Sequence, residues 1–410
     1  MQREDFTTEE VPVQFRTNPL NILLAWMGFI LVLVSMSFGG GLASQMNRED
    51  FVAAVLAGNA FLAVCAFVTG YVGSRSGLSF GSLAARIFVR GTWRIAILYI
   101  PFTLIGWYAI ESAIFGNLVS DTFAFSEVTR RAIMGGAAIF FSISAYLGVR
   151  FIGRISYLLI PIVLLGSLFA LFNLPKDAVL SFGFSETKTS LAQGATIVMT
   201  TWIFSALLVV PDLARFIRNP LTGGIVGAVG VFIGNTVALF IGAFAAAYTK
   251  QSDPALILIS LGFTPLAMML SFCSIWSTND NNMYSSSLSV ARSLSLPRQH
   301  VVVGLAIVGA IVALFNPATI GFMFSFLSFM GASAPPLAGI VIGGYIYRSV
   351  RADGPEGVVA PWLAWIGASF VAYKLDGIFA IPLGITLGFI FWAVLSEFEG
   401  RIVVSRSAPS

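Results

Sequence analysis

The sequence predicts an all-α membrane protein with twelve transmembrane helices, from its composition, its apolar runs and the positions of its basic residues. Of the 410 residues, 57% are hydrophobic and only 10% are charged. Soluble domains carry about 25% charged residues, so this chain could not cover a water-exposed surface. The solvent around most of it is therefore expected to be a lipid bilayer.

The apolar runs set the number of helices, because a membrane-crossing helix needs about 20 mostly apolar residues. Twelve runs fit, and the short runs at 301–316 and 358–373 fit least well. In chain order they are 20–45, 51–73, 92–117, 132–149, 155–173, 190–210, 222–248, 255–285, 301–316, 318–346, 358–373 and 377–396.

The Lys and Arg residues fix the expected orientation. With a cytoplasmic N-terminus, 16 of the 23 fall on the cytoplasmic side, and every cytoplasmic segment carries at least two. This is the positive-inside pattern, and a miscount of one span would destroy it. The sequence therefore predicts a multi-pass protein of the inner (plasma) membrane with cytoplasmic tails at 1–19 and 397–410. The net charge of +4 then needs no nucleic-acid partner.

The first ten spans divide into two sets of five, which predicts a core at 20–346. A repeated unit with an odd number of spans inserts in opposite orientations, so 20–173 and 190–346 would form an inverted repeat. This pairing matches span 1 with span 6 and span 3 with span 8. The two spans in 347–396 would be additional C-terminal helices.

A polar stretch in the eighth run, "STNDNN", is the most unusual feature of the chain. Six consecutive polar side chains point all around a helix, so some must face protein or water. A charged residue at mid-bilayer costs about 2.5–3.5 kcal/mol on insertion scales. Asp280 could hold helices together or face a cavity, but the whole stretch favours a span that lines a polar cavity.

Within this stretch, Ser277 and Thr278 place two hydroxyl oxygens side by side. Together with carbonyls freed by a broken helix, they could replace the hydration shell of a sodium ion. Gly39, Gly40 and Gly41 in the first run would permit such a break. The alternative explanation for these glycines is close packing between helices.

Aromatic and acidic residues indicate where a ligand could bind. Trp107 and Glu111 lie four residues apart in the third run and share one helix face. Trp202 and Phe204 lie in the sixth run. A flat ring could stack on such side chains. The alternatives are that Glu111 bonds a neighbouring helix and that the aromatic residues face lipid or core.

Other classes of protein are disfavoured. An enzyme would need a reactive constellation, but the single histidine, His300, falls in a predicted loop, and the sequence has no H-E-x-x-H motif. No catalytic residue and no cofactor are expected. A channel or a membrane scaffold is the alternative of a different class, although a scaffold would not need interior polarity.

Several segments resemble the nucleobase–cation symporter family, and bacterial cytosine permeases in particular. "SIWSTNDNNMY" is similar to the family's eighth-span segment, "GWYAIESAIF" to its third span, "PDLARFIRNP" to the segment after span 6, and "FLSFMGASAPPLAGIVIGGY" to span 10. The resemblance implies a leucine-transporter-like fold of ten core helices plus two. It also implies secondary active uptake by alternating access, coupled to sodium or protons.

The resemblance also implies a cation site. Ser277 and Thr278 take the position of sodium ligands, and backbone carbonyls near Phe29, Val32 and Ser274 would complete the site. The retained hydroxyl pair favours sodium over protons as the coupling ion.

The substrate site is implied in the same way. Trp107 takes the position of a stacking tryptophan, and Asn279 that of a substrate-bonding asparagine. Cytosine permeases have an aromatic residue where Ile203 aligns, and a shift by one residue would bring Trp202 or Phe204 there instead.

The expected substrate is a nucleobase or related planar nitrogen heterocycle, with cytosine as the family default. Cytosine permeases lack an acid at the position of Glu111, so the site is not expected to copy theirs. An ionised Glu111 would accept hydrogen bonds only and so would select N–H donors. A hydroxymethylpyrimidine or thiamine precursor, or an allantoin or hydantoin, is the alternative. The oligomeric state stays open, and a monomer is plausible.

Overall fold

All regular structure is helical in the computed structural model, which describes residue 6 and residues 9–174, 188–249, 253–350, 357–375 and 377–407. Parts of the predicted tails lie outside these residues. The first half contains η1 (Val13–Phe15), α1 (Pro19–Ile30), α2 (Leu33–Ala43), α3 (Arg48–Ser76), α4 (Phe80–Ala84), α5 (Trp93–Ala96), α6 (Tyr99–Phe123), α7 (Glu127–Leu147) and α8 (Val149–Phe172). The second half contains α10 (Leu191–Phe204), η2 (Ser205–Val209), α11 (Val210–Ala214), α12 (Pro220–Thr249), α13 (Pro254–Ser260), α14 (Thr264–Leu294), α15 (Arg298–Leu314), α16 (Ile320–Ala338), η3 (Gly339–Gly343), α17 (Gly344–Val350), α18 (Ala360–Leu375) and α19 (Ala380–Ser407).

The helices confirm an all-α protein that crosses a membrane several times. Among the described residues, seven helical segments are long and apolar enough to span a bilayer, and two bent helix pairs bring the number to as many as nine. The bent pairs are α1 with α2, at 54°, and α14 with α15, at 117°. The count of twelve stays a prediction.

Local sequence accounts for where the long helices begin and end. At the start of α3, the side chain of Asn47 accepts a hydrogen bond from the Asp50 N–H at 2.8 Å. Gly77, with φ +65°, ends that helix in the left-handed conformation that glycine adopts without strain. At the start of α10, Ser190 and Gln193 form a reciprocal capping box.

Two apolar runs are divided differently from the prediction. The run at 255–285 contains a turn at Gly262, with φ +85°, that separates α13 from α14. The run at 20–45 breaks at Leu31 and Val32, where Val32 is extended. The expectation that Gly39, Gly40 and Gly41 supply this break was wrong, since all three lie inside α2.

Gly39 instead allows close packing of α2 against α12. A side chain at Gly39 would overlap the backbone of Leu239, and one at Gly242 would overlap the backbone of Met36. The alternative explanation, close packing through small residues, therefore holds for Gly39.

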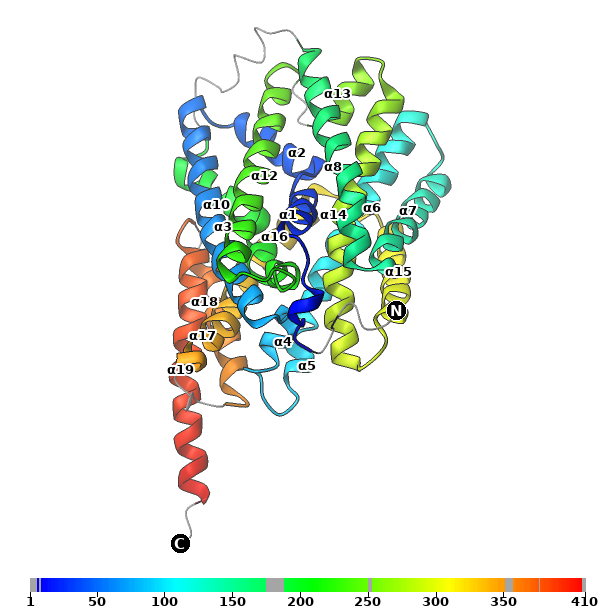
Figure 1. The fold of residues 1–410 in the computed structure, drawn as a ribbon. Coiled ribbons are helices and arrows are strands. Elements are labelled where there is room, and N and C mark those ends of the chain that lie inside the picture. The colour runs from blue at the N-terminus through cyan, green and yellow to red at the C-terminus, as the bar shows by residue number, and fades with distance from the viewer. Residues whose placement is uncertain are drawn as a thin grey trace.

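The helix α14 occupies a central position, since it contacts α1, α6, α7, α8 and α15. In Figure 1, α7 and α15 lie together along one edge of the molecule, and α17, α18 and α19 lie along the opposite edge. The broken pair α1/α2 lies between these edges, beside α12 and α14.

The segment that precedes α1 docks on the helix ends. The Val11 N–H donates to the Gly77 carbonyl at 2.9 Å, and the Thr17 N–H donates to the Phe216 carbonyl at 2.8 Å. The Arg16 guanidinium donates to the Ser74 carbonyl at 2.8 Å. These bonds tie the beginning of α1 to the ends of α3 and α11.

Candidate functional site

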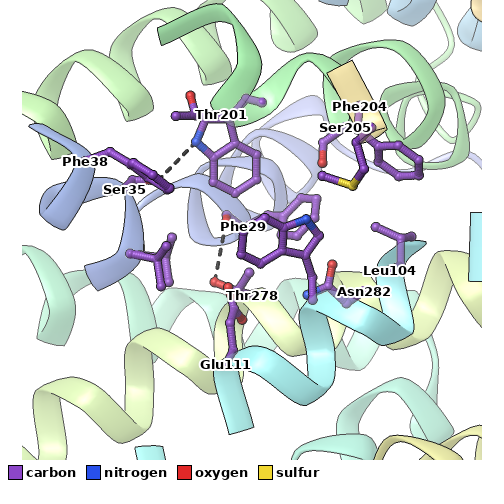
Figure 2. Close-up of a pocket in the computed structure, with 15 residues that line it drawn as sticks. Phe29, Ser35, Phe38, Leu104, Glu111, Thr201, Phe204, Ser205, Thr278 and Asn282 are labelled. Carbon is purple, nitrogen blue, oxygen red and sulfur yellow. Dashed lines mark hydrogen bonds between the residues drawn. The ribbon is translucent and has the colours of Figure 1, made fainter. Parts of the chain in front are cut away.

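A small cavity lies where the broken pair α1/α2 meets α6, α10, η2, α14 and α16 (Figure 2). Its volume is about 40 Å³. A water molecule needs roughly 10–15 Å³, so the cavity has room for about three waters. The predicted site residues that line it are Phe29, Val32, Trp107, Glu111, Trp202, Phe204 and Thr278.

The helix break beside the cavity releases backbone carbonyls. In a continuous helix, the carbonyls of Gly28 and Phe29 would accept from the N–H groups of Val32 and Leu33. Here the Val32 N–H donates to the carbonyl two residues earlier, at 2.8 Å. The Leu33 N–H donates to the hydroxyl of Ser274 on α14, at 3.0 Å. The two carbonyls are therefore free to face α14.

Hydroxyl groups of α14 meet these carbonyls. Ser277 Oγ lies 2.7 Å from the Gly28 carbonyl and 3.0 Å from the Ser274 carbonyl. Thr278 Oγ1 lies 3.4 Å from the Phe29 carbonyl, as the dashed line in Figure 2 marks, and 3.2 Å from the Ser274 carbonyl. These five uncharged oxygens form a cluster of the kind that hard cations bind, with no charge buried in advance.

Four of the five predicted ligand residues belong to the observed oxygen cluster: Phe29, Ser274, Ser277 and Thr278. Val32 lines the cavity, but its carbonyl accepts a hydrogen bond from the Met36 N–H at 3.2 Å, inside α2. Gly28 contributes a carbonyl that was not predicted. Knowing that the helix breaks at Leu31 would have identified it, because the carbonyls released are those three and two residues earlier.

Trp107 and Glu111 both line the cavity from α6, as their spacing of four predicts. Glu111 is only 3% exposed, and Figure 2 shows it pointing towards the cavity. Among the described residues, its Oε2 atom has no hydrogen-bond partner. The ring of Trp107 packs against Phe326 of α16, with centroids 5.9 Å apart. A residue with an unpaired acceptor and a tryptophan therefore line the same cavity from one helix.

Trp202 and Phe204 line the cavity from α10. The Trp202 indole N–H donates to the hydroxyl of Ser35 at 3.0 Å, and its ring meets Phe29 edge-on at 5.1 Å. Ile203 is fully buried in the apolar core and is not among the described residues that line the cavity. Both aromatic residues left open by the alignment therefore reach the cavity. Ser35 was missed, because no local pattern marks it.

Asn279 lies behind the cavity rather than on its wall. Its amide N–H donates to the Tyr108 carbonyl at 3.4 Å and to the Ser112 hydroxyl at 3.3 Å, both on α6. Its carbonyl oxygen accepts from Asn282 at 3.2 Å, and Asn282 lines the cavity. Asn282 was not predicted, although it follows Thr278 by one helical turn and so shares its face.

Asp280 faces a different neighbour, α7. Its carboxylate accepts a hydrogen bond from Ser144, which in turn accepts from the Trp276 indole N–H at 2.9 Å. Asp280 is 1% exposed, and its second oxygen has no partner among the described residues. Of the explanations left open by the sequence, this contact matches an acid held between helices.

The chain matches known permeases over most of its length. Residues 10–353 match the family described as permeases for cytosine/purines, uracil, thiamine and allantoin. The cytosine permease of Escherichia coli K12 is 26% identical over 401 residues, which cover 94% of this chain and 89% of that protein. Such relatives are transporters, so the chain is a permease rather than an enzyme, and a multi-pass inner-membrane protein.

Solved structures show the same fold. Mhp1, a nucleobase-cation-symport-1 family transporter, in a closed conformation with bromovinylhydantoin bound, matches with a TM-score of 0.78 at 16% identity, over 97% of this chain and 96% of Mhp1. Inward-facing Mhp1 matches with a TM-score of 0.71 at 18% identity, over 97% and 94%. A Na⁺-coupled sialic acid symporter matches with a TM-score of 0.68 at 13% identity, over 93% and 90%. The predicted resemblance is confirmed, and the chain belongs to the cytosine/purine, uracil, thiamine and allantoin permease family of nucleobase–cation symporters.

Proposed function

We propose that this permease imports a nucleobase or related planar nitrogen heterocycle by alternating access, coupled to sodium. The observation that carries the proposal is the position of Thr278. Its hydroxyl belongs to the oxygen cluster at the helix break, and the same residue lines the cavity. An ion and a substrate bound at these two places would share one side chain and one broken helix, which gives a direct physical route for coupling.

The ion would bind the five neutral oxygens, with Ser277 and Thr278 turning their hydroxyl protons away and offering lone pairs. Glu111 is the one ionisable side chain among the described residues that line the cavity. A sodium ion nearby would offset the negative charge of an ionised Glu111. Proton coupling through Glu111 is the alternative, and the retained hydroxyl pair favours sodium.

The heterocycle would stack on Trp107, and the unpaired oxygen of Glu111 would accept hydrogen bonds from its edge. Trp202 and Phe204 would line the site from α10, with Asn282 as a further hydrogen-bonding group and Asn279 holding its amide in place. Because the cavity holds only about three waters, the aromatic side chains must move apart when a ring enters.

The carboxylate of Glu111 would influence which heterocycle is transported. Aminopyrimidine and guanine-like edges offer N–H donors to a carboxylate, and the relative from Escherichia coli is a cytosine permease. The family description also includes thiamine and allantoin, so a thiamine precursor or an allantoin or hydantoin is the alternative substrate.

The proposal includes twelve spans. Seven of these are the single spans described above. The other five are the broken pair α1/α2, counted as one span, and the helices α7, α14, α15 and α18, counted as one span each. The 117° bend supports counting α14 and α15 separately, because the chain turns back on itself. The 16 to 21 residues of α18, α15 and α7 correspond to roughly 24 to 32 Å, close to the 30 Å hydrocarbon core.

The inverted repeat of 20–173 and 190–346 is also part of the proposal, with 347–396 as the two additional spans. Its support is that the first helix of each half departs from α-helical geometry. The pair α1/α2 is broken at Leu31, and η2 is a π-helical segment that interrupts α10 and α11. The arginine distribution supports cytoplasmic tails at 1–19 and 397–410. The monomer is the simplest functional unit.

Uptake into proteoliposomes tests this function. A panel of nucleobases, hydantoins and thiamine precursors would be supplied with a sodium gradient, with a proton gradient and with neither. We expect saturable uptake of one class under the sodium gradient. If the proton gradient alone drove uptake, the coupling ion would be the proton rather than sodium. A flux that does not saturate would favour a channel, and the absence of any bound heterocycle would favour a scaffold.

A further inference from the structure

A groove runs along the outer surface of the molecule between α3, η3 with α17, and α19. It consists of two adjoining cavities of about 450 Å³ and 240 Å³, which share Val68 and Ile346. Val64 and Ile346 on its walls are 63% and 41% exposed. In a protein that crosses the membrane, such side chains face lipid, so the groove opens sideways into the bilayer.

The side chains that line the larger cavity are almost all apolar. Its walls are mainly aliphatic and aromatic, and two threonines bring side-chain hydroxyls. Both hydroxyls already have partners: Thr69 donates to the Ala206 carbonyl at 2.6 Å, and Thr386 donates to the Pro382 carbonyl at 2.9 Å. An occupant of this part therefore needs no polar groups.

The smaller cavity is polar at one end. Arg75, in the last turn of α3, lines it together with Tyr71, Tyr345 and Ser349. The Arg86 guanidinium lies over the Tyr345 ring, 5.8 Å from its centroid. Arg75 is exposed, and neither arginine pairs with a carboxylate among the described residues. Arg75 thus lines the smaller cavity directly, and the positive charge of Arg86 lies over the ring of Tyr345, which lines it too.

We propose that this groove is a binding site for a phospholipid with an anionic headgroup. The acyl chain lies in the larger cavity, and the phosphate lies between Arg75 and Arg86. The charge complementarity selects an anionic lipid over a zwitterionic one, since each nearby arginine attracts anionic lipid by about 1 kcal/mol. A free phosphate would leave the hydrocarbon part empty, so the occupant is the lipid itself.

The lipid would touch a functional element from behind. Leu207 of η2 lines the groove, whereas Ser205 of the same five-residue segment lines the substrate cavity. Gly339 and Gly343 of the second π-helical segment, η3, line the groove as well. Single-turn π segments are rare and occur frequently at functional sites. An acyl chain in the groove therefore supports the back of the wall that faces the substrate.

Native mass spectrometry of the full chain tests the site with two lipids of identical acyl chains, phosphatidylglycerol and phosphatidylcholine. We expect the wild type to retain phosphatidylglycerol about thirtyfold more strongly, since two arginines contribute. The double variant R75Q/R86Q should lose this preference and bind the two lipids equally. The matched control is R154Q, which removes an exposed arginine near the start of α8, outside the groove, and should keep the preference.

A second variant tests the hydrocarbon part. Val68→Trp puts a bulky ring where the two cavities meet and should reduce retention of both lipids several-fold. A wild type without headgroup preference would overturn the proposal, and so would R75Q/R86Q with an undiminished preference. Full retention of phosphatidylglycerol by V68W would overturn the placement of the acyl chain. The comparison of the two lipids on the wild-type protein tests the proposal even if a variant fails to fold.

Discussion

Thr278 and Asp280 are two residues apart on α14, yet they face different surroundings. Thr278 meets a released carbonyl of α1 and lines the cavity. Asp280 meets Ser144 on α7, in a contact that the Trp276 indole N–H extends. One side of the helix thus faces a broken helix and a void, and the other faces an intact, close-packed one. The difference teaches that nearby polar residues of one membrane helix can be held in different ways, one beside a cavity and released carbonyls and the other by a hydrogen bond to the next helix.

The largest effect is expected from Trp107→Ala. Stacking of a base on an aromatic ring is worth about 1–3 kcal/mol, so substrate binding should weaken roughly 5- to 150-fold. The measurement is substrate protection in a thermal-shift assay. Trp276→Phe, on the side that faces α7, is the control and should bind substrate normally. If W107A kept its affinity, Trp107 would not belong to the site.

Thr278→Val removes one hydroxyl and keeps the shape of the side chain. Loss of a hydrogen-bonding group towards a charge costs about 1.5–3 kcal/mol, so the sodium concentration for half-maximal uptake should rise at least tenfold. Thr278→Ser retains the hydroxyl and should stay close to the wild type. An unchanged sodium dependence in T278V would remove the oxygen cluster from the coupling mechanism.

Glu111→Gln replaces a pure acceptor with a group that also donates. Competition assays should show a changed order of preference among nucleobases, with substrates that offer N–H donors losing roughly five- to tenfold in affinity. If E111Q and the wild type showed the same order of preference among nucleobases, Glu111 would have only a structural role, as we expect for Asp280.

The smallest effect on transport is expected from Asp280→Asn. The amide oxygen can still accept from Ser144, so stability should fall by only about 1 kcal/mol, measured by thermal unfolding in detergent. The substrate order and the sodium dependence should not change. A shifted coupling ion or substrate order in D280N would mean that the side facing α7 also takes part in transport.

The sequence predicted those features that depend on local spacing. Trp107 and Glu111 reach the same cavity because residues four apart share a helix face. The hydroxyls of Ser277 and Thr278 meet carbonyls of α1, a tertiary contact that the family resemblance rather than local spacing implied. The composition and the apolar runs were sufficient for an all-α membrane protein.

The remaining features depend on tertiary contacts. The break lies at Leu31 rather than at the glycines, and the hydroxyl of Ser274, far along the chain, accepts from the Leu33 N–H there. The rotation of α14 against α6 decides that Asn282 rather than Asn279 lines the cavity. A local pattern does not contain that rotation, because a stretch of six polar residues offers a candidate in every direction.

The central claim is that an ion at the oxygen cluster and a heterocycle in the cavity strengthen each other's binding. Calorimetry on the purified protein measures this directly, as the sodium affinity with and without substrate and the substrate affinity with and without sodium. Linkage requires the two factors to be equal, and we expect a factor of five or more that is lost in Thr278→Val. Affinities that do not depend on each other would contradict the account.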